Sequence, residues 1–86
     1  MKEFMLIVKN ESGLHARPAS LLAEKAQTYS SELTIIHEGT EIDAKSIVSI
    51  LCGGIGPGME IKVITDGEDE EEALAGIVGL ISSFTE

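Results

Sequence analysis

Three stretches of the chain carry the hydrophobic patterns of β-strands. Residues 3–8 form a short apolar run of strand-forming residues, which predicts a buried strand. Residues 33–43 hold two extended runs on either side of Gly39, a pattern typical of a β-hairpin that reverses at glycine. Residues 59–65 alternate between apolar and polar side chains, so we expect a half-exposed strand there.

Three further stretches have helical spacing. Apolar residues recur at this spacing from 16 to 29, with Pro18 in the first turn, where a missing N–H group costs little. Ser46 is a good N-cap for a short helix of little more than one turn, which a pair of glycines ends. The apolar residues of 73–84, behind an acidic first turn, predict the last helix.

The order of the predicted elements is βαββαβα. Four strands with one exposed face, and helices covering the other, indicate an α+β fold in two layers, antiparallel at least in its hairpin. With 86 residues, we expect a single domain over 1–86, which is too small for two cores or a deep active site.

The net charge narrows the classes of partner. The formal charge of -9 opposes binding to nucleic acid and to anionic lipid headgroups. Six of the fifteen carboxylates lie within residues 66–72, which we interpret as a solvated turn leading into a helix rather than a metal site.

Cysteine usage and hydropathy indicate an intracellular protein. Cys52 is the only cysteine, so an intrachain disulfide and a zinc-type spacing are both excluded, and we expect a small buried apolar side chain there. The first residues show no signal-peptide pattern, and no apolar run is long enough to cross a bilayer. His37, the only histidine besides His15, is expected to be a surface strand residue.

The chemically informative segment is Ser12-Gly13-Leu14-His15-Ala16-Arg17-Pro18-Ala19, where an imidazole stands at the start of a helix. The unpaired N–H groups of a first turn attract anions, and a guanidinium such as that of Arg17 can fork onto phosphate oxygens. A positive helix end also favours a neutral imidazole with a lone pair free to attack phosphorus. Because a residue before proline avoids helical dihedrals, the helix could instead start at Pro18, with Ala16 and Arg17 in the cap region.

This string resembles the phosphorylation-site motif of the HPr family, the histidine phosphocarriers of the bacterial sugar phosphotransferase system. The resemblance extends over the whole chain and implies an open-faced β-sandwich, with three helices on a four-stranded antiparallel sheet. It also implies that His15 accepts a phosphoryl group on Nδ1 from phospho-Enzyme I and donates it to Enzyme IIA domains. Arg17 and the backbone N–H of Ala16 would then steady the phosphoryl group, without a cofactor or metal.

The resemblance implies two further sites. Lys45-Ser46-Ile47 is similar to the regulatory serine site that HPr kinase/phosphorylase modifies in many Gram-positive bacteria. Its alternative explanation is the N-cap role of Ser46, which by itself is the commoner one. A partner-binding surface is implied by the resemblance at Ser12, Ile47, Val48 and Leu51, and we expect one or two of the three apolar residues to be exposed.

Two other functions remain open. An acyl carrier protein is also small and acidic and carries its prosthetic group on a serine that opens a helix, as Ser46 does, but acyl carriers are all-helical and Lys45 replaces their acidic residue. A regulatory HPr-like protein that binds other proteins without serving sugar uptake shares the fold. The HPr-like regulator Crh lacks the active-site histidine, so the presence of His15 argues against that identity. Cys52, Gly53 and Pro57 depart from the usual family pattern and leave the choice of partner open.

Overall fold

The seven expected elements are present in the expected order in a computed structural model, which describes residues 1–85. The strands are β1 (Lys2–Ile7), β2 (Glu32–His37), β3 (Thr40–Asp43) and β4 (Glu60–Asp66). The helices are α1 (Ala16–Ala26), α2 (Ile47–Cys52) and α3 (Glu70–Ser83).

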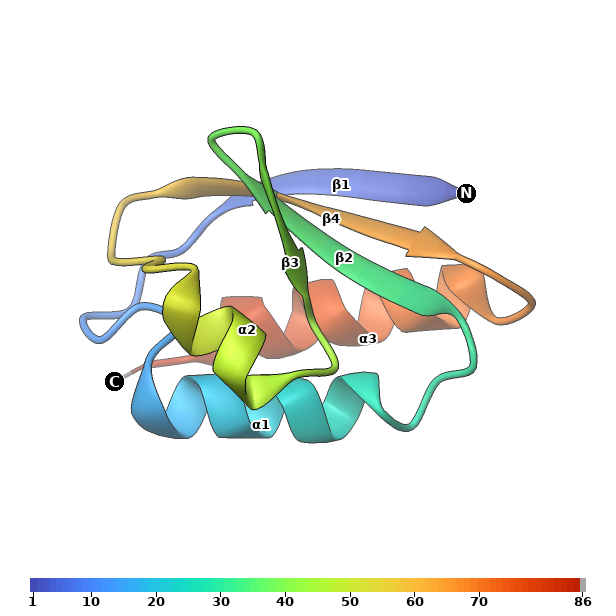
Figure 1. The fold of residues 1–86 in the computed structure, drawn as a ribbon, viewed down its shortest axis with the longest axis horizontal. Coiled ribbons are helices and arrows are strands. Elements are labelled where there is room, and N and C mark those ends of the chain that lie inside the picture. Colours follow the sequence, from blue (N-terminus) through green and yellow to red (C-terminus); the bar gives the residue numbers. More distant parts are fainter. Residues whose placement is uncertain (86) are drawn as a thin grey trace.

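The four strands form one sheet in the order β1-β4-β2-β3, and every neighbouring pair is antiparallel. The helices cover one face of this sheet and leave the other open (Figure 1). Val63 lies opposite Phe4 of β1 and Ile35 of β2, so side chains at these positions point toward the helices. This is the predicted α+β open-faced sandwich, and the antiparallel pairing extends beyond the hairpin.

The core lies between the sheet and the helices and consists of aliphatic side chains. Its largest fully buried members are Val8, Leu14, Leu22, Ile35, Ile42, Ile50, Ile61, Val63 and Ile77. These side chains come from every helix and strand except β1. Val8, just after β1, and Leu14, in the loop before α1, also belong to the core, so both segments are anchored there.

Local sequence explains the turns. Glu38 and Gly39 have φ angles of 49° and 81°, so both central residues of the β2–β3 hairpin are left-handed, as a two-residue hairpin requires. The Ser46 side chain accepts a hydrogen bond from the N–H of Ser49 at 3.1 Å and caps α2. Gly54, with a φ of 63°, follows the end of α2. These features confirm the predicted hairpin and the predicted N-cap.

Two predictions about burial are wrong. Strand β1 was expected to be buried, but all its residues except Leu6 are exposed, because it lies at the edge of the sheet and α3 covers it only in part. Cys52 was expected to be buried and is exposed, because α2 buries only Ile50 against the core. Two apolar residues assigned to helices, Tyr29 and Phe84, lie just beyond the ends of α1 and α3 and pack against the core from there.

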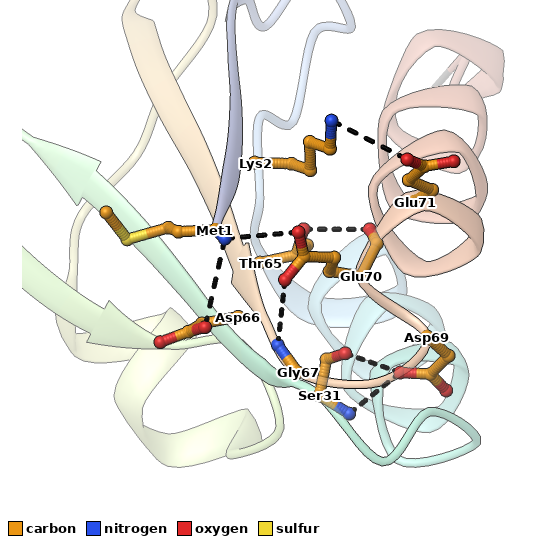
Figure 2. A network of polar contacts seen from close by, with 9 residues as sticks. All are labelled: Met1, Lys2, Ser31, Thr65, Asp66, Gly67, Asp69, Glu70 and Glu71. Carbon is orange, nitrogen blue, oxygen red and sulfur yellow. Dashed lines mark hydrogen bonds and ion pairs between the residues drawn. The ribbon is translucent and has the colours of Figure 1, made fainter.

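The acidic turn before α3 is structured rather than merely solvated (Figure 2). The Asp69 carboxylate accepts hydrogen bonds from the N–H groups of Ser30 and Ser31 and from the Ser31 hydroxyl, and these bonds lower the pKa of Asp69 to about 2. Glu70 accepts from the N–H of Gly67 at 3.2 Å and from the Met1 ammonium at 3.1 Å, which lowers its pKa as well. These contacts connect the turn to the start of β1 and to the segment before β2.

Candidate phosphorylation site

His15 lies in an exposed segment of three residues that is buried on both sides. Leu14 is 1% exposed and Pro18 is buried, whereas His15, Ala16 and Arg17 are all exposed. His15 is the N-cap residue of α1, with extended backbone (φ -123°, ψ 160°), and its side chain makes no capping hydrogen bond. The imidazole is therefore accessible to a second protein, while the backbone on both sides is held in the core.

The loop before His15 is fixed by contacts with the loop after α2. The N–H of Leu14 donates to the carbonyl oxygen of Ile55 at 3.0 Å. Gly13 has a φ of 61°, and a Cβ there would collide with the carbonyl oxygen of Ile55 and with Cα of Gly56. Glycine is therefore needed at position 13 both for its backbone conformation and for its close approach to the other loop.

Ala16, directly after His15, has a φ of 44°, which is left-handed and rare for a residue with a Cβ. This conformation costs about 1–2 kcal/mol for an L-residue outside glycine. Helix α1 is bounded at Ala16, but Ala16 itself is left-handed, so the right-handed backbone begins after Ala16, close to the later start considered from the sequence. The unusual backbone lies next to the imidazole.

The start of α1 provides a positive environment for an anion. Arg17 is exposed and brings a guanidinium group to the first turn, which contains no acidic residue. The N–H groups of a first helical turn have no partner within the helix, and the dipole of an eleven-residue helix adds partial positive charge at this end. This arrangement suits a phosphoryl group on the neighbouring imidazole.

Helix α2 lies beside α1 and presents an apolar surface. Ile47, Val48 and Leu51 are 42%, 70% and 36% exposed, and we call these three residues the α2 patch. The prediction that only one or two of them would be exposed is wrong, because the buried contact of this short helix is made by Ile50 alone. The Gln27 side chain donates to the carbonyl oxygen of Lys45 at 2.9 Å and links the end of α1 to the segment before α2. Since Ile55 follows α2 and bonds to Leu14, the end of α2 lies toward the start of α1, whereas the bond from Gln27 places the beginning of α2 nearer the end of α1 (Figure 1).

The remaining predicted site residues are placed as follows. Ser12 is exposed in the turn before Gly13, three residues from His15. Ser46 is half-buried at the start of α2, with its hydroxyl oxygen engaged in the cap. His37 is in a strand, as expected, at the end of β2, and it is half-buried: its side chain is 13% exposed and its Nδ1 lies 3.4 Å from the carbonyl oxygen of Glu60.

The sequence analysis overlooked Asn10 and Ile55. Asn10 is only 5% exposed, and its amide donates to the carbonyl oxygen of Gly13 at 2.8 Å. Ile55 supplies the carbonyl that receives the Leu14 N–H. Asparagine three residues before a glycine is a turn signal that could have identified Asn10. The role of Ile55 depends on a backbone oxygen and leaves no trace in the sequence.

Nothing in the described part of the chain suggests a metal site or a membrane span. Within residues 1–85, no three His, Cys, Asp or Glu side chains lie where they could share a metal ion. The helices of this part are all too short or too polar to span a bilayer.

Comparison with known proteins agrees with this geometry. Residues 2–83 match the family model described as the PTS HPr component phosphorylation site. The chain is 45% identical over 78 residues to the phosphocarrier protein HPr of Mycoplasma genitalium, which covers 90% of this chain and 89% of the relative. It is also 40% identical over 81 residues to the HPr-like protein Crh of Halalkalibacterium halodurans, covering 94% and 96% of the two chains.

Solved structures show the same fold. The crystal structure of HPr-C-His from Thermoanaerobacter tengcongensis superposes with a TM-score of 0.94 at 41% identity, over 96% of this chain and 93% of the other. The crystal structure of Crh from Bacillus subtilis, a dimer with a swapped domain, has a TM-score of 0.78 at 31% identity, over 94% and 93% of the two chains. The match to the phosphorylation-site model and the relatives of nearly full length establish that the chain belongs to the HPr family of phosphocarrier proteins.

Proposed function

We propose that the chain accepts a phosphoryl group from phospho-Enzyme I on His15 and passes it to Enzyme IIA domains. The observation that carries this proposal is the exposed imidazole of His15 at the start of α1, between the buried residues Leu14 and Pro18. A carrier needs its acceptor accessible to two successive partners, and the shape of this segment meets that need. The charge of Arg17 beside it supports the same interpretation.

The transfer consists of two matching displacements. The Nδ1 lone pair of a neutral His15 attacks the phosphorus of phospho-Enzyme I, and the bond from phosphorus to the donor breaks as the new N–P bond forms. The second displacement repeats this on His15, with an Enzyme IIA domain as acceptor. Arg17 and the Ala16 N–H are assigned to the phosphoryl oxygens, where positive charge and donors stabilise the transferring group.

The α2 patch and Ser12 are assigned to partner docking. Exposed apolar side chains gathered on one helix are typical of a surface that a partner covers. The acidic turn of residues 66–69 lies at the opposite end of the molecule from the start of α1, so its carboxylates do not surround this surface (Figure 1). The proposed function also locates the chain in the cytoplasm, where an unpaired Cys52 is expected.

Ser46 is proposed as a regulatory phosphorylation site for HPr kinase/phosphorylase. Its position at the start of α2, next to Ile47 of the α2 patch, would place a phosphate at the edge of the docking surface. A phosphate at a helix N-terminus is tolerated electrostatically, so modification would change docking more than folding. Incubation with the kinase and ATP, followed by peptide mass spectrometry, tests this, with Ser46→Ala as the control that must remain unmodified.

A regulator that acts through protein binding is the second candidate, favoured by the 40% identity to a protein named Crh. One experiment separates the two candidates. The chain and its His15→Ala variant are incubated with Enzyme I and phosphoenolpyruvate, and their intact masses are measured. A carrier gains one acid-labile phosphoryl group that the variant lacks. A chain that gains none under conditions that charge an authentic HPr is a regulator.

A further inference from the structure

Two hydrogen bonds between Asn10 and Gly13 close the turn that leads to His15. Asn10 donates one of them and accepts the other. Its side-chain amide donates to the carbonyl oxygen of Gly13 at 2.8 Å, and the N–H of Gly13 donates to the carbonyl oxygen of Asn10 at 3.1 Å. The Asn10 side chain is buried, with 5% of the residue exposed. A buried hydrogen bond of this kind is expensive to break, since the carbonyl group would lose its partner away from water.

The side-chain bond of Asn10 and a separate bond to Ile55 hold a single peptide plane at both of its polar ends. The plane joins Gly13 to Leu14, and its oxygen is bound by Asn10 while its N–H is bound by the carbonyl oxygen of Ile55 at 3.0 Å. The Leu14 side chain is buried in the core. His15 is the next residue, so the direction in which its Cα–Cβ bond points depends on this plane and on the anchored Leu14.

We propose that Asn10 is a positioning residue for phosphoryl transfer, acting through the Gly13–Leu14 peptide to aim the imidazole of His15. The inference rests on the proposed carrier function. Asn10 does not touch the phosphoryl group, because its amide is buried and bonded to Gly13 while the imidazole stands in solvent. Its contribution is the orientation of the nucleophile, and misplacing a reacting group by about 1 Å can cost up to about a hundredfold in rate.

The amide donor can be removed while the shape of the side chain is kept. Asn10→Asp retains the size and the acceptor oxygen but places a carboxylate oxygen against the Gly13 carbonyl, so the bond is replaced by repulsion. Asn10→Ala removes the bond without adding repulsion. If the donor matters, Asp is at least as harmful as Ala, whereas a purely space-filling role makes Ala the worse of the two.

The first test is the steady-state phosphorylation of each variant by Enzyme I and phosphoenolpyruvate. We expect kcat to fall about tenfold in Asn10→Asp and less in Asn10→Ala, with KM nearly unchanged because the docking surface is intact. Ser31→Ala is the matched control, since Ser31 is equally buried and loses a hydrogen bond to Asp69 at the other end of the molecule. The proposal is overturned if Asn10→Asp keeps the parental kcat, if only KM changes, or if Ser31→Ala lowers kcat equally.

A second measurement does not depend on the carrier function. Hydrogen exchange of the Leu14 N–H reports directly on the peptide plane, and we expect it to be about tenfold faster in both Asn10 variants and unchanged in Ser31→Ala. If the parent chain is not phosphorylated at all, the proposed function fails while this measurement still decides whether Asn10 holds the plane. Unchanged exchange in the Asn10 variants refutes the positioning role.

Discussion

At the scale of single residues, the site depends on side chains and glycines that shape a short loop. Asn10, Gly13 and Leu14 fix the backbone, and the three residues that follow Leu14 are exposed. The left-handed φ of Ala16 lies at the start of α1, directly after His15, the proposed nucleophile. The reactive group is thus exposed although its backbone is rigidly held.

Gly13→Ala is expected to damage this loop more than the same change at another left-handed glycine. Both Gly13 and Gly54 have φ near +60°, so alanine at either position costs about 1 kcal/mol of unfolding free energy from backbone strain. Only at Gly13 would the new Cβ also strike the Ile55 carbonyl, whereas nothing lies within 4 Å at Gly54. Urea unfolding should show Gly13→Ala losing about 1–3 kcal/mol more than Gly54→Ala. Equal losses would mean that the close contact between Gly13 and the Ile55 carbonyl oxygen does not restrict position 13.

At the scale of elements, the six residues of α2 combine one buried side chain with the exposed patch proposed for docking. Ile50 faces the core, and the α2 patch faces solvent. The cap at Ser46 and the left-handed Gly54 confine the helix to this length. A helix this short gains little stability from its own hydrogen bonds, so its packing through Ile50 maintains the patch.

A substitution at an exposed position of α2 should therefore affect mainly docking, and one at its buried position mainly stability. Val48→Asp places a charge on a side chain that is 70% exposed, so the unfolding free energy should change by less than about 0.5 kcal/mol. In the phosphorylation assay its KM for Enzyme I should rise at least about tenfold, because a charge is buried when the partner covers the patch.

Ile50→Ala is the matched control for that change. It removes a fully buried side chain and should lower the unfolding free energy by about 2–4 kcal/mol. Because packing through Ile50 also maintains the patch, its KM should rise as well, but by less than that of Val48→Asp, whereas its stability should fall far more. A parental KM for Val48→Asp would exclude the α2 patch from docking.

The elements could be predicted from the sequence because their patterns are local. The hairpin at Gly39, the cap at Ser46 and the alternation in β4 each depend on residues close together in the chain. The exposure of β1 could not be predicted in this way, because it results from the place of the strand at the sheet edge. Likewise, the full exposure of the α2 patch depends on which single face of α2 meets the core, and the role of Ile55 depends on a contact between two loops.

At the scale of the whole molecule, the reactive group and the acidic turn lie at opposite ends of the longest dimension, 33 Å (Figure 1). The acidic turn ties three separate segments together through Asp69 and Glu70 (Figure 2). Stability can therefore be changed at the acidic turn without altering the surroundings of His15.

The free energy of unfolding should fall in acid, because the Asp69 carboxylate becomes protonated. The hydrogen bonds from Ser30 and Ser31 lower its pKa from 3.8 to about 2, so the folded state holds the carboxylate charged more readily than the unfolded state does. This stabilisation is complete above the unfolded pKa and is lost as the pH falls from about 4 through about 2.

Asp69→Asn is the variant that isolates this effect. It should be less stable than the parent at pH 7, and the difference in thermal unfolding temperature should shrink as the pH approaches 2. Phosphorylation of His15 at pH 7 should be unaffected while the variant remains folded. A difference in unfolding temperature that stays constant from pH 7 to pH 2 would assign the stabilisation to something other than this carboxylate.

The most direct measurement of the central claim follows the phosphoryl group through both transfers. The chain is charged with labelled phosphoenolpyruvate and Enzyme I, separated from both, and mixed with an Enzyme IIA domain. We predict that the label leaves His15 and appears on the Enzyme IIA domain in equal amount. Label that stays on the chain, or that is released only to water, would contradict its role as a carrier.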